Sequence, residues 1–404
     1  MGWNGAGRPR FPVMGGEAVP FLRTAFPGVA LRPPRWAIAV IAALAACGRG
    51  REPVVSGVSA PAEVVGTPFR YTSPYARNVW DMQRFGSRIY LSHGDEIGNR
   101  GPAEIWSLDP ASGRLARDFV TGDEEIESFR VIDGELYAPG LDPRAGWSMG
   151  DFYRLERSGW VRHRTIPRAV HTFDMASHEG TLFAATGGRG WAGEPTLLAS
   201  DNRGRTWTPA ADESQRIYTL FELGDALYAA PKLRTDGDSS RAVLRYDGAR
   251  FRSTGVTGAT LLPGLPDTAG RMLRPTAFRG ALVYVVAAGA INWKPAALAV
   301  TRDLRDARAV PFPDPAAVPY DLLVRGDTLL ALTSAPADSG YVVRVYATVR
   351  LDGWRERFRF RSPTFARSFE EVEGDYFIGL GCTYQRPSPA SGLILRVRQR
   401  SYAP

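Results

Sequence analysis

Three segments of the chain place a tryptophan near a basic residue in a stretch rich in glycine and polar residues. The pairs are Arg144 with Trp147, Arg189 with Trp191, and Trp293 with Lys294. A tryptophan offers a flat apolar face to a sugar ring or another aromatic group, and a guanidinium or ammonium group binds a carboxylate. These six residues are therefore candidates for a ligand-binding face. The alternative is that each tryptophan covers the edge of the fold while the cation is solvated.

The sequence has no recognisable catalytic or metal-binding motif. Its four histidines, at positions 93, 163, 171 and 178, are not spaced like two ligands of one metal. No glycine-rich phosphate loop precedes a helix, and no Ser-His-Asp signature is present. We therefore assign no catalytic residue, no metal and no cofactor. Cys382 is expected to be a small buried side chain.

An apolar segment precedes the first of the two cysteines. Basic residues at 32–35 are followed by eleven residues without a charge, 36–46. This run is too short to cross a bilayer, which needs about 20 residues, and it matches the apolar region of a secretory signal. Leu44-Ala45-Ala46-Cys47 resembles the lipobox of bacterial lipoproteins. The resemblance implies export and a lipid anchor on Cys47, at the outer membrane or cell surface.

Two features of this segment leave alternatives open. An ordinary secretory signal or a chance apolar segment would also give a run of this length. The basic region before the apolar run is unusually long, which indicates a translation start placed too far upstream. A start at Val29 would give a leader of ordinary length.

The rest of the chain repeats one pattern seven times. Each copy has an apolar strand, a tight turn with glycine, and a second strand with an aromatic or aliphatic pair. The turn glycines are Gly86, Gly134, Gly180, Gly224, Gly280, Gly326 and Gly374, which are 44 to 56 residues apart. This period fits four short strands, and a second hairpin with a turn at Ser158-Gly159 supports that number. Seven such units predict an all-β, seven-bladed β-propeller of four-stranded antiparallel blades.

The repeats also set the expected domain boundaries. We place the signal peptide at 1–46, the lipidated Cys47 with a flexible linker at 47–65, and the propeller at 66–404. The last unit lacks its outermost strand, because the chain stops soon after residue 395. A strand at 66–73 precedes the first unit, and we expect it to complete the last blade and close the ring.

One turn resembles a known motif. Residues 200–207, Ser-Asp-Asn-Arg-Gly-Arg-Thr-Trp, resemble the Asp-box of BNR repeats, with Asn202 at the aspartate position. The motif occurs in sialidases and in other extracellular propellers. The resemblance implies a structural turn between a third and a fourth strand, formed by Ser200, Asn202, Gly204, Thr206 and Trp207. The further residues that sialidases need are not recognisable, so no catalytic residue is carried over.

Charge and composition narrow the function classes. The formal net charge of +8 falls to +4 once the first 46 residues are removed, and the arginines are spread over the whole chain, so nucleic acid is not an expected partner. We expect a monomeric, non-catalytic cell-envelope protein that binds a glycan or a protein partner through loops on one face. One alternative is a sialidase-like glycoside hydrolase, which needs two or three convergent acidic residues and an arginine cluster in the central pocket. The other is an envelope assembly scaffold, which predicts a featureless pocket.

Overall fold

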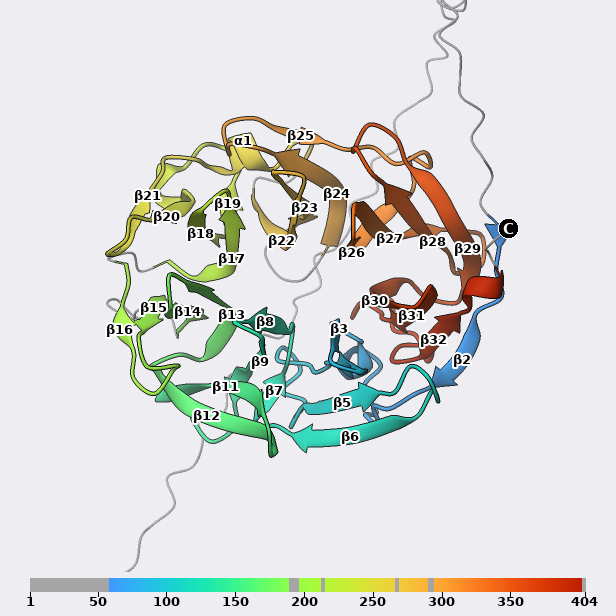
Figure 1. Ribbon diagram of the computed structural model, residues 1–404, viewed down its shortest axis with the longest axis horizontal. Coiled ribbons are helices and arrows are strands. Elements are labelled where there is room, and N and C mark those ends of the chain that lie inside the picture. The colour runs from blue at the N-terminus through green and yellow to red at the C-terminus, as the bar shows by residue number, and fades with distance from the viewer. Residues whose placement is uncertain (1–57, 189–195, 212–214, 266–268, 290–293, 402–404) are drawn as a thin grey trace, which may run out of the picture. The chain divides into compact units, whose positions relative to one another are not determined.

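The strands of this protein form a ring of seven sheets around a common axis (Figure 1). The computed structural model describes residues 58–188, 196–211, 215–265, 269–289 and 294–401, so Cys47, Arg189, Trp191 and Trp293 lie outside the described residues. Each sheet contains four antiparallel strands that follow one another from the axis outward. The predicted all-β fold, a seven-bladed β-propeller with four-stranded antiparallel blades, is therefore confirmed.

The first three blades occupy the chain from residue 82 to residue 209. Blade 1 comprises β3 Met82–Phe85, β4 Arg88–Leu91, β5 Glu104–Leu108 and β6 Leu115–Val120. Blade 2 comprises β8 Arg130–Ile132, β9 Glu135–Pro139, β11 Met149–Glu156 and β12 Gly159–Pro167. Blade 3 comprises β13 His171–His178, β14 Thr181–Gly187, β15 Leu197–Ser200 and β16 Thr208–Pro209. Its sheet continues beyond β13 through β10 Leu141–Pro143 and β7 Asp123–Glu125.

The next three blades follow the same plan. Blade 4 comprises β17 Ile217–Leu223, β18 Ala226–Pro231, β20 Leu244–Tyr246 and β21 Phe251–Ser253. Blade 5 comprises β22 Ala269–Phe278, β23 Ala281–Ala288, β24 Lys294–Thr301 and β25 Ala307–Ala309, and β19 Leu233–Arg234 pairs with β22. Blade 6 comprises β26 Val318–Arg325, β27 Thr328–Pro336, β28 Tyr341–Thr348 and β29 Arg355–Ser362.

Blade 7 joins the two ends of the described chain. It comprises β30 Ala366–Val372, β31 Asp375–Leu380, β32 Ile394–Val397 and, outermost, β2 Glu63–Gly66. The few helical turns are α1 Gly258–Leu261, η1 Tyr75–Arg77, η2 Ser239–Arg241 and η3 Gln399–Ser401. Within the described ranges, no helix has the length and apolar character that crossing a membrane requires.

The ring is closed by a strand other than the one we expected. β2 is antiparallel to β32 and fills the outermost place of blade 7. The expected closing strand at 66–73 is wrong, because residues 67–73 form no strand. Pro68 has no N–H to give to a ladder, and Phe69 is 2% exposed among the apolar side chains between blades 7 and 1. There its ring stacks on His93, with centroids 4.0 Å apart.

The expected flexible linker at 47–65 is also partly wrong. β1 Val58–Ser59 runs parallel to β29 and covers the outer edge of blade 6. β2 begins within the same stretch. Backbone pairing of β1 and β2 therefore holds this stretch to the propeller from Val58 onward.

The seven hairpin turns have the positive φ angles that the repeated glycines predicted. All seven turn glycines have positive φ, between 58° and 87°. In four of the turns the preceding residue also has positive φ, as a type I′ turn requires; these residues are Asp133, Glu179, Arg279 and Glu373. One detail differs, since the second turn of blade 2 lies at residues 157–158 and not at Ser158-Gly159.

The apolar core is divided among the interfaces between blades. Seven clusters of buried apolar side chains among the described residues each join two neighbouring blades. Because a blade packs against two neighbours, its central strands are apolar on both faces, and seven of the eight residues of β23 are buried. Cys382 is fully buried against Tyr75 and Trp80, as expected for a small apolar side chain.

The strand order defines two faces of the ring. We call the side that carries the two-residue hairpin turns the turn face. The other side carries the loops between second and third strands and the connections from one blade to the next, and we call it the loop face. Arg144 and Trp147 lie in the loop between β9 and β11, and Lys294 begins the third strand of blade 5, so these three residues of the Trp-basic pairs belong to the loop face.

Candidate functional site

Five of the seven innermost strands have a β-bulge close to the loop face. The pairing register slips there, and the residues that the strand ladder skips are Phe173, Tyr218, Tyr320 and Arg367, together with Arg274 and Pro275 in blade 5. A bulge redirects a side chain out of the regular alternation, and bulges are over-represented beside active sites. We call the region that these side chains surround, at the loop-face end of the axis, the axial site.

Aromatic rings and guanidinium groups stack around the axial site. The rings of Phe173 and Tyr218 have centroids 4.4 Å apart, and the guanidinium of Arg271 lies 4.2 Å from the centre of the Tyr218 ring. Farther round, the guanidinium of Arg367 lies 3.5 Å from the centre of the Trp80 ring. Tyr218 remains partly exposed and borders a small cavity of about 30 Å³. The site therefore combines the partly exposed ring of Tyr218 with cations that stack on aromatic rings.

Two short strands and one glycine bring acidic side chains to the same place. β7 supplies Glu125, the following residues supply Glu127, and β10 supplies Asp142. The loop between β4 and β5 supplies Glu96, and this loop approaches β7 so closely that a Cβ on Gly94 would lie 2.3 Å from Cα of Glu125. The amide of Glu96 then donates to Oε2 of Glu125 at 3.2 Å.

These carboxyl groups differ in their preference for a proton. Burial raises the pKa of Glu125 well above its usual range, and the neighbouring Glu96 and Glu127 raise it further. Burial also raises the pKa of Glu127, although Arg271 opposes the shift. At Glu96, burial is outweighed by His171, which holds its pKa below the usual value. The axial site thus places one carboxylate beside two carboxyl groups that favour the neutral form.

The arginines nearest the axis are engaged by other side chains. Nη1 of Arg274 lies 2.8 Å from Oδ1 of Asp81, and its Nε lies 3.2 Å from Oδ1 of Asp321. Nε of Arg130 lies 2.6 Å from Oδ1 of Asp174. Arg367 is only 5% exposed and stacks on Trp80. These guanidinium groups are therefore not arranged as an open triad for the carboxylate of a substrate.

The aspartates among these partners form a repeated link between blades. Asp81, Asp174 and Asp321 each accept the amide of the next residue at 2.8 to 3.0 Å. The second oxygen of each accepts an amide of the following blade, from Phe129, Leu220 and Phe369 respectively. These three aspartates therefore have a structural role in joining blades. Glu96, Glu125 and Glu127 do not take part in this repeated link.

Of the sequence-predicted ligand face, the structure describes Arg144, Trp147 and Lys294. We call the exposed loop after β10 the rim of the loop face. Arg144 and Trp147 follow β10, where both are exposed, and Trp147 is 38% exposed. Lys294 begins β24 and is also exposed. Arg189, Trp191 and Trp293 fall outside the described residues. Arg144 is close enough to Glu124 for its charge to act on that carboxyl group. Burial raises the pKa of Glu124, and the positive charge of Arg144 lowers it.

The Asp-box-like residues lie on the turn face and contact one another. Oγ of Ser200 accepts the amide of Gly204 at 2.8 Å, and Oδ1 of Asn202 accepts the amide of Thr206 at 3.0 Å. Trp207 packs against the apolar cluster between blades 2 and 3. The turn joins β15 to β16, the third and fourth strands of its blade. These contacts make the segment a self-supporting turn remote from the axial site.

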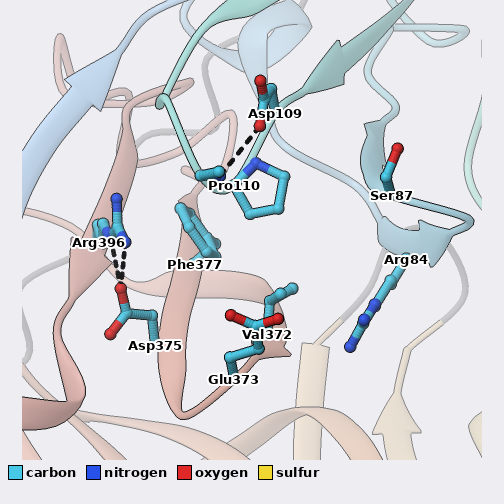
Figure 2. A pocket seen from close by; sticks show the side chains of 10 residues that line it. Arg84, Ser87, Asp109, Pro110, Val372, Glu373, Asp375, Phe377 and Arg396 are labelled. Atoms are coloured by element: carbon cyan, nitrogen blue, oxygen red, sulfur yellow. Dashed lines mark hydrogen bonds and ion pairs between the residues drawn. The ribbon is translucent and has the colours of Figure 1, made fainter.

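A groove on the turn face is large enough for a ligand, but a similar groove occurs at a second interface between blades. It measures about 320 Å³ and lies between blades 7 and 1 (Figure 2). Figure 2 shows the ion pair of Arg396 with Asp375 on one wall and Arg84 on the other.

The same groove recurs between blades 2 and 3 with a volume of about 330 Å³. Its residues Asp133 and Glu135 stand where Glu373 and Asp375 stand in blade 7, on either side of the turn glycine. A groove at equivalent places of two interfaces follows from the spacing of the hairpin turns. We therefore assign the candidate site to the axis.

The sequence analysis missed the acidic part of the axial site. One signal was present, because Asp123-Glu124-Glu125 and Glu127 form an acidic run in the connection from blade 1 to blade 2. The other contributors, Glu96, Asp142 and His171, come from different blades and have no shared sequence pattern. Only the pairing of β10 with β13 and β7 brings them together.

Comparison with known proteins agrees with the fold. The sequence matches no protein-family profile and no curated protein. Among solved structures, virginiamycin B lyase from Staphylococcus aureus is similar with a TM-score of 0.54, over 84% of this chain and 99% of that chain, at 10% identity. The WD40 β-propeller domain of Doa1 has a TM-score of 0.51 over 85% of this chain and 100% of that chain, also at 10% identity. Similarity at this level establishes the β-propeller fold.

Proposed function

We propose that this protein is a cell-envelope binding protein that takes a glycan at the axial site. The observation that carries the proposal is the convergence of bulged aromatic residues, such as Tyr218, with carboxylates from blade 1 and its connection to blade 2. Sugar rings present apolar faces for stacking and hydroxyl groups that donate to carboxylates. The pocket is not featureless, which argues against a purely structural scaffold.

The charges of the axial site favour a neutral or amino sugar over an acidic one. Glu96, whose pKa is lowered, would repel the carboxylate of a sialic acid, and the neutral carboxyl groups of Glu125 and Glu127 would offer it no opposite charge. The buried Arg274 is already paired with Asp81 and Asp321, so it is not available to compensate. This distribution argues against a sialidase-like substrate.

Cys47 completes the proposed function by setting the location. The lipobox resemblance supports acylation at this residue and retention on the bacterial envelope. The axial site would then work at the membrane surface, on envelope or extracellular glycans. Exposed Arg144 and Trp147 stand at the rim and are positioned to contact a longer ligand.

The test is binding of the full-length protein, purified in mild detergent, to an array of neutral, amino and acidic glycans. We expect neutral or amino glycans to bind, and Tyr218→Ala to weaken binding at least tenfold in titration calorimetry. Tyr228→Ala is the matched control, since Tyr228 lies half-buried in the same blade near the turn face. Absence of glycan binding, or wild-type affinity of Tyr218→Ala, would contradict the proposal.

Glycan hydrolysis is the second candidate function. It is favoured by the contrast between Glu96, whose pKa is lowered, and Glu125 and Glu127, whose pKa values are raised. Glycosidases pair a neutral carboxylic acid with an ionised carboxylate in this way. New reducing ends released from a bound glycan, and lost in both Glu125→Gln and Glu127→Gln, would establish hydrolysis; an intact glycan would leave binding alone.

A further inference from the structure

Three side chains at the edge of the axial site converge on one point. Glu96 comes from the loop between β4 and β5, Asp142 from β10, and His171 is the first residue of β13. Nδ1 of His171 lies 3.1 Å from Oε2 of Glu96 and 3.0 Å from Oδ1 of Asp142. One donor atom from each residue lies within 4.8 Å of the other two. The side chain of His171 is 12% exposed, so the nitrogen is shielded from solvent.

These distances fit two arrangements, which hydrogen-bond direction distinguishes. A protonated imidazole between two carboxylates would donate its ring N–H to one of them. Yet Nδ1 of His171 and Oδ1 of Asp142 are both buried, and neither has a hydrogen-bond partner among the described residues. The 3.0 Å between Nδ1 and Oδ1 is short enough for a hydrogen bond. The angle is what fails, because the ring N–H does not point at the oxygen. Buried polar atoms are nearly always satisfied, and a cation between the two atoms would satisfy both of them.

The surrounding charge also favours a cation. Among the described residues, Asp95, Glu124 and Glu125 lie close to Glu96 and Asp142, and Oε2 of Glu124 is buried without a hydrogen-bond partner. Burial, together with Asp142, Asp95 and Glu96, raises the pKa of Glu124 to about 7. These carboxyl groups are held together against their mutual repulsion, which a divalent cation would relieve.

The nearby basic side chains are largely directed elsewhere. Arg271 stacks on Tyr218 and lies 3.9 Å from Glu127. Nη2 of Arg216 donates to the carbonyl of Gly188 at 2.7 Å. Arg144 is exposed at the rim. Among the described residues, His171 is the basic group that lies within 3.1 Å of both carboxylates, and a metal ion would bind its imidazole in the neutral form.

We propose that Glu96, Asp142 and His171 bind a first-row divalent cation of the Zn²⁺ or Mn²⁺ type. An imidazole nitrogen suits Zn²⁺, and two carboxylate oxygens suit Mn²⁺ as well. Ligand bonds of about 2.1 Å place neighbouring ligands of an octahedral ion about 3.0 Å apart, which matches the separations from Nδ1. Three protein ligands leave coordination positions open to the axial site.

The experiment measures the metal alone, without any glycan, so its result is separate from that of the glycan array. Full-length protein in detergent is stripped with a chelator and titrated with ZnCl₂ and then MnCl₂ by calorimetry. We expect one saturable site per chain for at least one ion, and a thermal midpoint that rises when that ion is added. His171→Gln and Asp142→Asn should each weaken binding at least tenfold and remove the thermal shift.

Two choices keep this test decisive. His178→Gln is the matched control, because His178 ends the same strand, lies 3.8 Å from Glu222 and belongs to the turn face; it should bind the ion like the wild type. Asp142→Asn replaces one oxygen and suits the φ of 57° at this position, so it serves if His171→Gln fails to fold. Absence of saturable binding of both ions, or wild-type binding by folded Asp142→Asn, would overturn the proposal in favour of an ion pair.

Discussion

Arg274 of blade 5 lies 2.8 Å from Asp81 of blade 1, so its guanidinium connects two blades that are not neighbours in the ring. The same guanidinium lies 3.2 Å from Asp321 of blade 6. Arg274 is a bulge residue with φ of 51°, and its side chain is 9% exposed. One buried cation therefore links blades 1, 5 and 6 near the axis.

Replacing this cation should destabilise the propeller strongly. Arg274→Met leaves the buried carboxyl groups of Asp81 and Asp321 without their cation, and loss of one member of a buried ion pair costs about 3–5 kcal/mol. Urea denaturation followed by circular dichroism measures the change in the free energy of unfolding.

Arg279→Met provides a control in the same hairpin, because Arg279 lies in the turn that follows β22. Arg279 also has positive φ, but it is half exposed and its partner Asp327 lies 3.8 Å away. Its loss should cost less than about 1 kcal/mol. Equal effects of the two substitutions would mean that the connection across the axis contributes little.

The stability of the protein should also depend on pH through His93. Nδ1 lies 2.9 Å from the carbonyl oxygen of Ala76, to which it donates, and Nε2 accepts the amide of Glu104 at 2.8 Å, which requires a neutral ring. Burial lowers the pKa of His93 from 6.5 to about 4. Between these values the unfolded chain binds the proton and the folded protein does not. This contribution to stability is therefore complete above pH 6.5 and is lost as the pH falls toward 4.

The difference between wild type and His93→Gln isolates this effect from other titrating groups. We expect the wild type to lose stability between pH 7 and pH 5 with a slope approaching about 1.4 kcal/mol per pH unit in excess of the variant. Urea midpoints at a series of pH values give the slope. Parallel curves for the two proteins would show that His93 is not responsible.

The propeller could be predicted because its blades depend on local sequence. Each hairpin needs a residue with positive φ at a fixed place, and glycines such as Gly134 and Gly326 supply it. The position of the closing strand was harder, since Phe69 reads as a strand residue. Its ring instead fills the space between blades 7 and 1.

The axial site could not be predicted because its members meet only through the fold. Tyr218 and Arg367 occupy bulges, and a bulge leaves no mark in a pattern of alternating residues. His171 and Glu96 are 75 residues apart and belong to different blades. The Trp-basic pairs attracted notice because each is local, yet Arg144 and Trp147 stand at the rim and not at the axis.

Lipidation at Cys47 is a prediction that the chain's two cysteines can test. Cys47→Ala should remove incorporation of a labelled fatty acid and move the protein from the membrane fraction to the soluble exported fraction. Cys382→Ala is the control, because Cys382 is buried in the propeller and should keep both label and location. Membrane retention of Cys47→Ala without acylation would contradict the lipid anchor.

A side chain at Gly204 should destabilise the Asp-box-like turn. This residue has φ of 82°, and a Cβ would lie 2.5 Å from Cζ of Phe152. Gly248 has φ of 93° with nothing within 4 Å of a Cβ, so Gly248→Ala carries the backbone cost alone. We expect Gly204→Ala to lower the free energy of unfolding by at least about 1 kcal/mol more than Gly248→Ala, because overpacking is added to backbone strain. Equal losses in urea denaturation would show that Phe152 moves aside without cost.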